Sequence, residues 1–187
     1  MTAGAGSVEG VNELRQALED DAAFTAWYRR HLPRVYGYLM SRCANDEALA
    51  EELTQLTFVA AINERARFDG RSETGTWLCG IARHKLADHF RRLEREERRQ
   101  MHLEVRQIAV EDDAVPGESL DQRVAIGEAM RSLPAGQRAV LTFVVLDGMS
   151  VREAGRLMGR SALATQSLLH RARESFRRAY GEERVDG

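Results

Sequence analysis

The stretch that most constrains this chain runs from Ser150 to Tyr180 and reads as two helices joined by a tight turn. Ser150 and Glu153 have the spacing of a capping box, in which the serine hydroxyl accepts a backbone N–H and the glutamate reaches back. Gly159 stands where a chain leaving a helix needs a left-handed residue, and Ser161 can cap the next helix. The sequence therefore predicts one helix beginning after Ser150 and a second beginning after Ser161.

The second of these helices has an apolar face and a basic face. At helical spacing the apolar arc contains Thr165, Leu169, Ala172 and Phe176. The opposite side carries Gln166, Ser167, His170, Arg171, Glu174, Arg177 and Arg178. A buried face and a basic face after a short turn are typical of a helix-turn-helix, whose second helix enters a DNA major groove. An ordinary helical hairpin with a solvated basic face is the alternative that these residues leave open.

Charge is distributed in blocks that the net value of −2 conceals. Residues 24–100 carry 14 basic and 11 acidic side chains, and residues 120–187 carry 11 and 8. Residues 101–119, which lie between them, carry one basic and five acidic side chains. Two mildly basic blocks are thus separated by an acidic segment, so the whole-chain pI of about 6.2 does not exclude nucleic acid as a partner.

Several function classes find no support. Cys43 and Cys79 form no CxxC pair, which argues against a zinc site or a disulfide framework and favours a reducing cytosol. The N-terminus lacks a signal-peptide pattern, and no apolar run approaches the ~20 residues that span a bilayer, so we expect a soluble cytoplasmic protein without membrane insertion. No phosphate-binding glycine motif, zinc motif or nucleophile elbow occurs, and the five histidines are scattered. The sequence therefore predicts no enzyme, no metal, no cofactor and no small-molecule substrate.

The N-terminal half reads as three helices. Asp20 or Asp21 can cap the first, which continues through Leu39 with Pro33 kinking or dividing it. Asn45 or Asp46 can cap the second, expected over residues 47–66, whose apolar face contains Leu49, Leu53, Leu56, Val59, Ala60 and Ile62. Its remaining surface presents Glu51, Glu52 and Gln55 with Phe58 beside them. An acidic patch next to an apolar residue is usually a solvated rim, but it is also typical of a docking site for a basic partner.

A glycine-rich loop over residues 68–76 precedes the third helix, expected from Trp77 to Arg99 with Thr76 as its cap. The residues that we expect to meet phosphate are Arg83, His84, Lys85, Arg91 and Arg92. Beyond Leu93 the mixture of Glu and Arg predicts ion pairs within the helix on a solvated face.

The C-terminal part reads as four helices around one core. A helix over residues 120–132 contains the apolar residues Val124, Ile126, Ala129 and Met130. The next helix opens at Pro134, continues through Leu141, Val144 and Val145, and stops at Asp147-Gly148. We therefore predict an all-α fold of two small helical domains joined by an acidic linker. The expected boundaries are a disordered tail at 1–20, domains at 21–100 and 120–181, a linker at 101–119 and a tail at 182–187.

In this order the segments resemble an extracytoplasmic-function (ECF) sigma factor, of the sigma-70 family of bacterial RNA polymerase specificity subunits. Three blocks carry the resemblance: AEELTQLTF at Ala50–Phe58, FDGRS followed by TWLCGIARHKLADHFRR at residues 68–92, and SLPAGQRAVLTFVVLDGMSVREAGRLMGRS followed by SLLHRAR at residues 132–173. They are similar to the region-two docking helix, the segment that reads and melts the minus-ten element, and region four, which reads the minus-thirty-five duplex. The resemblance covers both predicted domains.

This resemblance implies a factor that binds core RNA polymerase and directs promoter-specific transcription initiation, regulated by an anti-sigma partner. Contact with the largest-subunit clamp of polymerase is implied for Glu51, Glu52, Leu53, Gln55 and Phe58, and the beta flap is the partner implied for region four. Minus-ten contacts are implied for Phe68, Arg71, Ser72, Trp77, Arg83, His84, Lys85, Asp88, Arg91 and Arg92. Minus-thirty-five contacts are implied for Ser161, Gln166, Ser167, His170, Arg171, Arg173 and Arg177.

The chain departs from the family pattern in three segments. Asparagine is common where His84 stands, and an acidic residue is common where Leu56-Thr57 follows Gln55. Lysine and arginine often occupy the positions of Gln166 and Leu168, and Leu168 falls at the edge of the buried arc. The main alternative function is a conventional helix-turn-helix regulator that acts without stable polymerase association. Such a regulator would account for Ser150–Tyr180 but not for the other two blocks.

Overall fold

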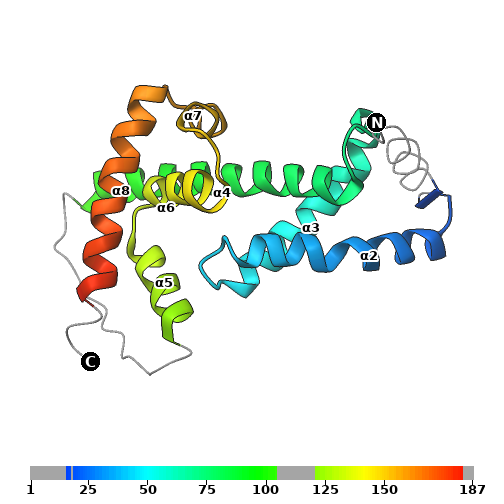
Figure 1. Ribbon diagram of the computed structural model, residues 1–187, viewed down its shortest axis with the longest axis horizontal. Coiled ribbons are helices and arrows are strands. Elements are labelled where there is room, and N and C mark those ends of the chain that lie inside the picture. Colours follow the sequence, from blue (N-terminus) through cyan, green and yellow to red (C-terminus); the bar gives the residue numbers. More distant parts are fainter. Residues whose placement is uncertain (1–15, 18, 105–120, 183–187) are drawn as a thin grey trace, which may run out of the picture. The chain divides into compact units, whose positions relative to one another are not determined.

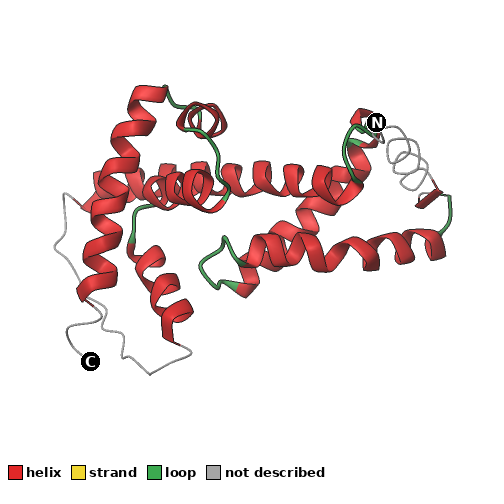
Figure 2. Ribbon diagram, in the orientation of Figure 1, coloured by secondary structure: helices red, strands yellow, loops and turns green. Residues whose placement is uncertain are grey.

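The structure is a computed structural model that describes residues 16–17, 19–104 and 121–182. Every element of regular structure in these residues is helical, which confirms the predicted all-α class (Figure 2). The chain forms two compact units, residues 1–86 and 87–187 (Figure 1). Helix α4 (Thr74–Glu104) contributes its first part to one unit and its remainder to the other. Most of the expected N-terminal tail and most of the acidic linker lie outside the described residues.

The first unit is built on α2 (Asp21–Met40) and α3 (Glu47–Asn63), with a short 3-10 helix, η1, at Arg65–Arg67. Asp20 caps α2 by accepting from the backbone N–H of Ala23 at 2.7 Å, and Asp46 caps α3 by accepting from that of Leu49 at 2.9 Å. Both are among the caps that the sequence predicts. Pro33 lies inside α2 without dividing it.

Aromatic packing joins α2 to α3 in the core of this unit. Phe58 is 3% exposed and meets Trp27 edge-on, with ring centroids 5.4 Å apart. Tyr28 lies against the same ring at 4.6 Å. Large buried rings of this kind supply much of the apolar area that a small core needs. Phe58 is therefore a core residue and not, as expected, a surface neighbour of Glu51 and Glu52.

The third helix begins earlier and ends later than predicted. Its first residue is Thr74 instead of Trp77, and its last is Glu104 instead of Arg99. Thr76 is inside the helix, where its hydroxyl accepts from Arg34 at 3.0 Å. Arg34 also pairs with Glu73 at 2.9 Å, so a tertiary contact holds the first turn. Sequence spacing alone cannot reveal such a contact.

The second unit contains α5 (Asp121–Ser132), α6 (Ala135–Leu141), α7 (Val151–Met158) and α8 (Ala162–Glu182). A π-helical segment, η2 (Thr142–Leu146), continues α6, and Gly148 turns the chain with φ +66°. Helix α8 packs on α5, α6 and α7. The largest fully buried side chain of this core is Phe143, which also meets Phe90 of α4 with ring centroids 6.1 Å apart. The predicted four-helix C-terminal core is thus present, with α4 added to it.

Several apolar side chains of the predicted helices lie at the surface, Leu56 and Val59 of the expected apolar face among them. Their exposed fractions are 41% for Leu56, 56% for Val59, 39% for Val124, 41% for Ile126 and 55% for Val145. In α3 the buried side keeps Leu53 and Ala60 of the predicted face, and Thr54, Thr57 and Ala61 take the places expected for Leu56 and Val59. The hydrophobic pattern was misleading because a close helix–helix contact favours small side chains over large ones.

Candidate nucleic-acid interface

The turn between α7 and α8 has the predicted geometry. The Ser150 hydroxyl accepts from the backbone N–H of Glu153 at 3.3 Å, and the Glu153 carboxylate accepts from that of Ser150 at 2.9 Å. The Ser150 hydroxyl also donates to the Glu153 carboxylate at 2.5 Å, and this bond, followed by the one from the Ser150 backbone N–H, lowers the pKa of Glu153. Gly159 adopts φ +69°, and Ser161 accepts from the backbone N–H of Ala164 at 3.2 Å. The capping box, the left-handed turn and the second cap are therefore confirmed.

Close backbone approach makes this turn tight. The backbone N–H of Arg160 donates to the carbonyl of Gly155 at 2.7 Å. A Cβ at position 155 would lie 2.9 Å from the carbonyl oxygen of Arg160 and 2.8 Å from the hydroxyl oxygen of Thr165. Only glycine fits there without displacing the chain. Gly155 therefore fixes how closely α7 and α8 pack, and so how α8 is presented.

Helix α8 divides into the two predicted faces. Thr165, Leu169 and Ala172 are buried, and Leu168 is buried beside them at 7% exposure. The residues expected at DNA, Ser161, Gln166, Ser167, His170, Arg171, Arg173 and Arg177, are all exposed. Because Leu168 belongs to the core, no charged side chain could occupy that position without being buried. The departure from the family pattern at Leu168 is thus a packing feature of this chain.

One exposed residue of α8 was missed. Leu163, in the first turn, is 79% exposed, which is unusual for a large apolar side chain. It shares a helix face with Gln166, Ser167 and His170, three, four and seven residues on, and we name these four residues the reading stripe. The spacing is present in the sequence and would have revealed Leu163. Further along α8, His170 lies 3.4 Å from Glu174 between ring nitrogen and carboxylate oxygen.

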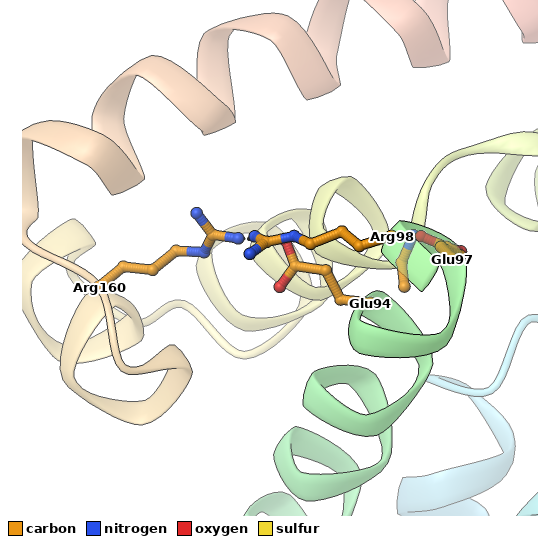
Figure 3. A network of polar contacts seen from close by, with 5 residues as sticks. Glu94, Glu97, Arg98 and Arg160 are labelled. Carbon is orange, nitrogen blue, oxygen red and sulfur yellow. Dashed lines mark hydrogen bonds and ion pairs between the residues drawn. The ribbon is translucent and has the colours of Figure 1, made fainter. Parts of the chain in front are cut away.

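Ion pairs expected within α4 also reach out of the helix. Glu94 pairs with Arg98 at 2.9 Å, as predicted, and also with Arg160 at the α7–α8 turn (Figure 3). Glu97 accepts from the backbone N–H of Ala135 at 3.0 Å, at the start of α6. The Pro134 cap offers no side-chain bond there, so Glu97 satisfies an otherwise unpaired helix donor. The prediction of a purely intrahelical, solvated network was wrong for Glu94 and Glu97.

Arg138 lies in the same network, 3.7 Å from Glu97. Burial lowers the pKa of its guanidinium, and the Glu97 charge opposes that effect. A buried cation of this kind needs its carboxylate partner, because leaving it alone in the core would be costly. Glu97 therefore serves α6 twice, as a backbone acceptor and as a counter-charge.

On α3 the residues predicted to meet polymerase separate into two groups. Glu51, Glu52 and Gln55 are exposed, whereas Leu53 is 2% exposed and Phe58 3%. Leu56 and Val59, which were expected on the buried apolar face, lie on the exposed side with the acidic residues. We name Glu51, Glu52, Gln55, Leu56 and Val59 the docking surface. Leu53 and Phe58 lie beneath it and hold it in place.

The loop before α4 is folded against itself. Phe68 is 6% exposed and packs on the half-buried Trp77, with ring centroids 4.8 Å apart. Asp69 accepts from the backbone N–H of Arg71 at 3.1 Å and pairs with the Arg71 guanidinium at 3.2 Å. Phe68 thus supports Trp77 from below, while Arg71 is exposed and Ser72 partly so.

The basic residues of α4 differ in exposure. His84, Arg91 and Arg92 are exposed, whereas Lys85 and Arg83 are partly covered. Arg83 donates to the Tyr38 hydroxyl at 3.3 Å, and Arg91 pairs with Asp88. Arg92 lies 3.4 Å from the ring of His89. The exposed members are available to phosphate, and Asp88 holds Arg91 in one orientation.

Neither cysteine is paired. Cys43 is buried, which together with the nearby Asp46 raises the pKa of its thiol to about 12. Burial also raises the pKa of Cys79, against the opposing influence of Arg34, Arg42 and Arg83. Among the residues that the structure describes, no group of three or more His, Cys, Asp or Glu side chains is arranged to hold a metal ion. Over the same residues, no helix is both long and apolar enough to span a bilayer.

Two family models match the chain, in the order that the two domains predict. Sigma-70 region 2 matches residues 27–96, and Sigma-70, region 4 matches residues 123–176. The first match covers α3 and most of α2 and α4, and the second covers α7 and most of α8.

Curated relatives match over nearly their whole length. The chain is 36% identical to "ECF RNA polymerase sigma factor SigF" of Caulobacter vibrioides, over 84% of this chain and 89% of that protein. It is 31% identical to "RNA polymerase sigma factor CarQ" of Myxococcus xanthus, over 92% and 96%. Among solved structures, the sigma factor RpoE from Bartonella quintana, crystallised in complex with the anti-sigma factor NepR, has the same fold. The superposition covers 83% of this chain and 95% of the RpoE chain, with 23% sequence identity and a TM-score of 0.51.

Proposed function

The chain belongs to the ECF RNA polymerase sigma factors, which bind core RNA polymerase and direct it to promoter DNA, and we propose how its residues divide that work. The docking surface on α3 binds core polymerase. The loop at residues 68–73 and the basic part of α4 hold the minus-ten element, and α8 reads the minus-thirty-five duplex. The observation that carries this proposal is a helix-turn-helix with an exposed basic helix, in a chain that also matches region two.

The docking surface suits a protein partner better than it suits DNA. Glu51 and Glu52 would repel phosphate, so nucleic acid is excluded as its ligand. Leu56 at 41% and Val59 at 56% exposure offer apolar area next to polar side chains, a combination usual in protein interfaces. A basic, apolar helix face on core polymerase is the complement that this surface requires. Leu53 and Phe58 act from beneath by fixing the helix.

The minus-ten part combines an aromatic platform with positive charge. Trp77, supported by Phe68, presents a ring on which an unstacked base can lie, and base–aromatic stacking is worth about 1–3 kcal/mol. Arg71 and Ser72 stand beside it in the loop, and the exposed His84, Arg91 and Arg92 offer positive and hydrogen-bonding groups to the backbone. Arg83 and Lys85 add positive charge at the phosphates, and Asp88 orients Arg91 by pairing with it. Melting is therefore assigned to the loop and α4.

The minus-thirty-five part combines phosphate contacts with base contacts. Arg171, Arg173 and Arg177 are exposed and sit beyond the first two turns of α8, where they can reach phosphates and fix the register of the helix. Ser161 and the reading stripe lie at the N-terminal end, which in a helix-turn-helix approaches the base edges. The boundaries that we propose for the two modules are residues 21–100 and 120–181, joined by the acidic segment 101–119.

Regulation and location follow from these partners. An anti-sigma partner would act by covering the docking surface or α8, since either would block holoenzyme formation or promoter binding. The factor itself performs no catalysis and works in the cytoplasm, where polymerase and promoter DNA meet. Contact of region four with the polymerase beta flap is part of the same proposal. The alternative function, a helix-turn-helix regulator that binds duplex DNA without polymerase, would give the docking surface no role.

The decisive experiment combines the purified full-length chain with core polymerase and a pool of random duplexes. We expect co-elution with core in size-exclusion chromatography and enrichment of one two-part promoter, from which the reconstituted enzyme initiates specifically. Tight duplex binding by the chain alone, with no association with core, would refute the proposal and support the regulator.

A further inference from the structure

The first two turns of α8 carry no charged side chain. Residues 162–169 read ALATQSLL, and the first arginine of the helix is Arg171. A DNA-reading helix that identifies guanine in the major groove normally uses arginine or lysine, which donate to its O6 and N7 atoms. The part of α8 that approaches the bases therefore lacks the usual guanine-reading groups. Its specificity must come from uncharged side chains.

Leu163 is the most unusual of these uncharged side chains. At 79% it is more exposed than the other large apolar side chains that are exposed in the described residues, although its neighbours Leu168 and Leu169 are buried. Its position in the first turn of α8 leaves it outside the core, beside Gln166 on the reading stripe. Its apolar surface is thus uncovered in the free protein, on the face that carries the polar groups available to bases.

The surroundings of Leu163 favour DNA as the group that covers it. The same exposed side of α8 continues into His170, Arg171 and Arg177, and no acidic residue occurs between Ser161 and Arg173. An approaching surface must therefore be negatively charged and must also offer an apolar group near the start of the helix. The major groove meets both requirements, because phosphates line its edges and the C5 methyl of thymine projects into it.

We propose that Leu163 packs against the C5 methyl of a thymine in the minus-thirty-five duplex, and that Gln166 reads a neighbouring adenine through its N6 and N7 atoms. This inference rests on the proposed function, since it assigns base contacts within the region-four module. It makes the element under the first two turns of α8 rich in A·T pairs, with a defined strand polarity. Leu163 is then a specificity-determining residue, and the arginines further along supply affinity.

The test removes the methyl group and nothing else. A promoter selected by the reconstituted holoenzyme is resynthesised with deoxyuridine in place of each upstream thymine in turn, which preserves every hydrogen bond. We expect wild-type holoenzyme to bind about three- to fivefold more weakly when one particular thymine is replaced, as the loss of a buried methyl predicts. Holoenzyme with Leu163→Ala should bind the thymine promoter more weakly by the same factor. Replacing that thymine by deoxyuridine should weaken its binding no further.

Two controls make the result decisive. Ile126→Ala removes another exposed apolar side chain, 41% exposed on α5, and should keep the full preference for thymine. Gln166→Ala should keep the methyl effect and relax the preference for adenine at the adjacent pair. The inference is overturned if deoxyuridine at every upstream position leaves binding unchanged. It is also overturned if Leu163→Ala weakens binding to the thymine and deoxyuridine promoters equally, so that the preference for the methyl group persists. Specific initiation would persist in both cases, whereas failure of the proposed function would abolish initiation from every promoter.

Discussion

The docking surface on α3 and the reading stripe on α8 make an informative comparison. Both are exposed faces of amphipathic helices, and both present large apolar side chains to solvent, Leu56 and Val59 in one case and Leu163 in the other. On α3 the apolar residues stand beside Glu51 and Glu52, whereas α8 continues into arginines. An exposed apolar side chain does not by itself identify a ligand. The charge around it decides between a protein and DNA.

The largest effect is expected from a substitution in α7 that shifts the α7–α8 turn. Gly155→Ala places a Cβ 2.9 Å from the Arg160 carbonyl oxygen, so the α7–α8 turn must shift. We expect the free energy of unfolding of the second unit to fall by about 2–3 kcal/mol, in the range of other overpacking changes. Minus-thirty-five binding should fall with it, while association with core through α3 persists.

Spectroscopy can assign that loss to one unit. Trp27 and Trp77 are the two tryptophans of the chain, and both lie in the first unit. Urea unfolding followed by tryptophan fluorescence should therefore be unchanged in Gly155→Ala, whereas circular dichroism at 222 nm should show an earlier loss of helix. Gly181→Ala is the matched control, because its Cβ would meet nothing within 4 Å. Equal behaviour of the two variants would contradict the close approach at Gly155.

The converse substitution disturbs only the docking surface. Val59 is 56% exposed, so Val59→Asp should leave the fold intact while placing a charge in the apolar centre of the interface. We expect core polymerase to bind about 30-fold more weakly, the size of effect usual for a hot-spot residue. Titration of labelled core measures it. Met101→Asp, at an exposed apolar position on α4, should bind core normally, and an equal loss there would deny α3 its special role.

A smaller effect separates phosphate contact from base contact on α8. If Arg171 meets a phosphate, Arg171→Ala should weaken promoter binding several-fold at every sequence and lower the slope of log affinity against log salt by about one. Arg131→Ala on α5, where the arginine lies 3.9 Å from Glu128, should leave the slope unchanged. Fluorescence anisotropy across a salt series provides both values. An unaltered slope in Arg171→Ala would remove that residue from the phosphate contacts.

The smallest effect concerns the capping box that begins α7. Hydrogen bonds from Ser150 lower the pKa of Glu153, so the folded state holds the ionised carboxylate more firmly than the unfolded chain does. The resulting stability is present above the unfolded pKa, near 4.5, and is lost as pH falls through the lower folded value. Glu153→Gln should flatten the stability profile at pH values below 4.5, where the carboxylate of the folded chain becomes protonated. A parallel shift of the whole profile would show that Glu153 does not titrate in this way.

Local signals predicted the helices and the caps that begin four of them. The caps at Asp20, Asp46, Ser150 and Ser161 each depend on a side chain that bonds a backbone group three residues away, which sequence spacing reveals directly. The buried arc of α8 was equally predictable, because a strict helical period places Thr165, Leu169 and Ala172 on one side. The motif order was sufficient to identify the family, which the comparisons confirm.

Tertiary packing decided what no local rule contains. Glu94 pairs with Arg160, 66 positions away, and Glu97 accepts from the backbone of Ala135, 38 positions away. Their helical spacing predicts only partners within α4. Phe58, expected at the surface, is buried against Trp27 and Tyr28, whereas Leu56 and Val59, expected inside, are exposed. By itself the sequence determined the helices, their caps and the family, because those depend on neighbours along the chain. Only the tertiary structure decided which apolar side chains remain outside, since close helix contacts are filled by whichever side chains fit.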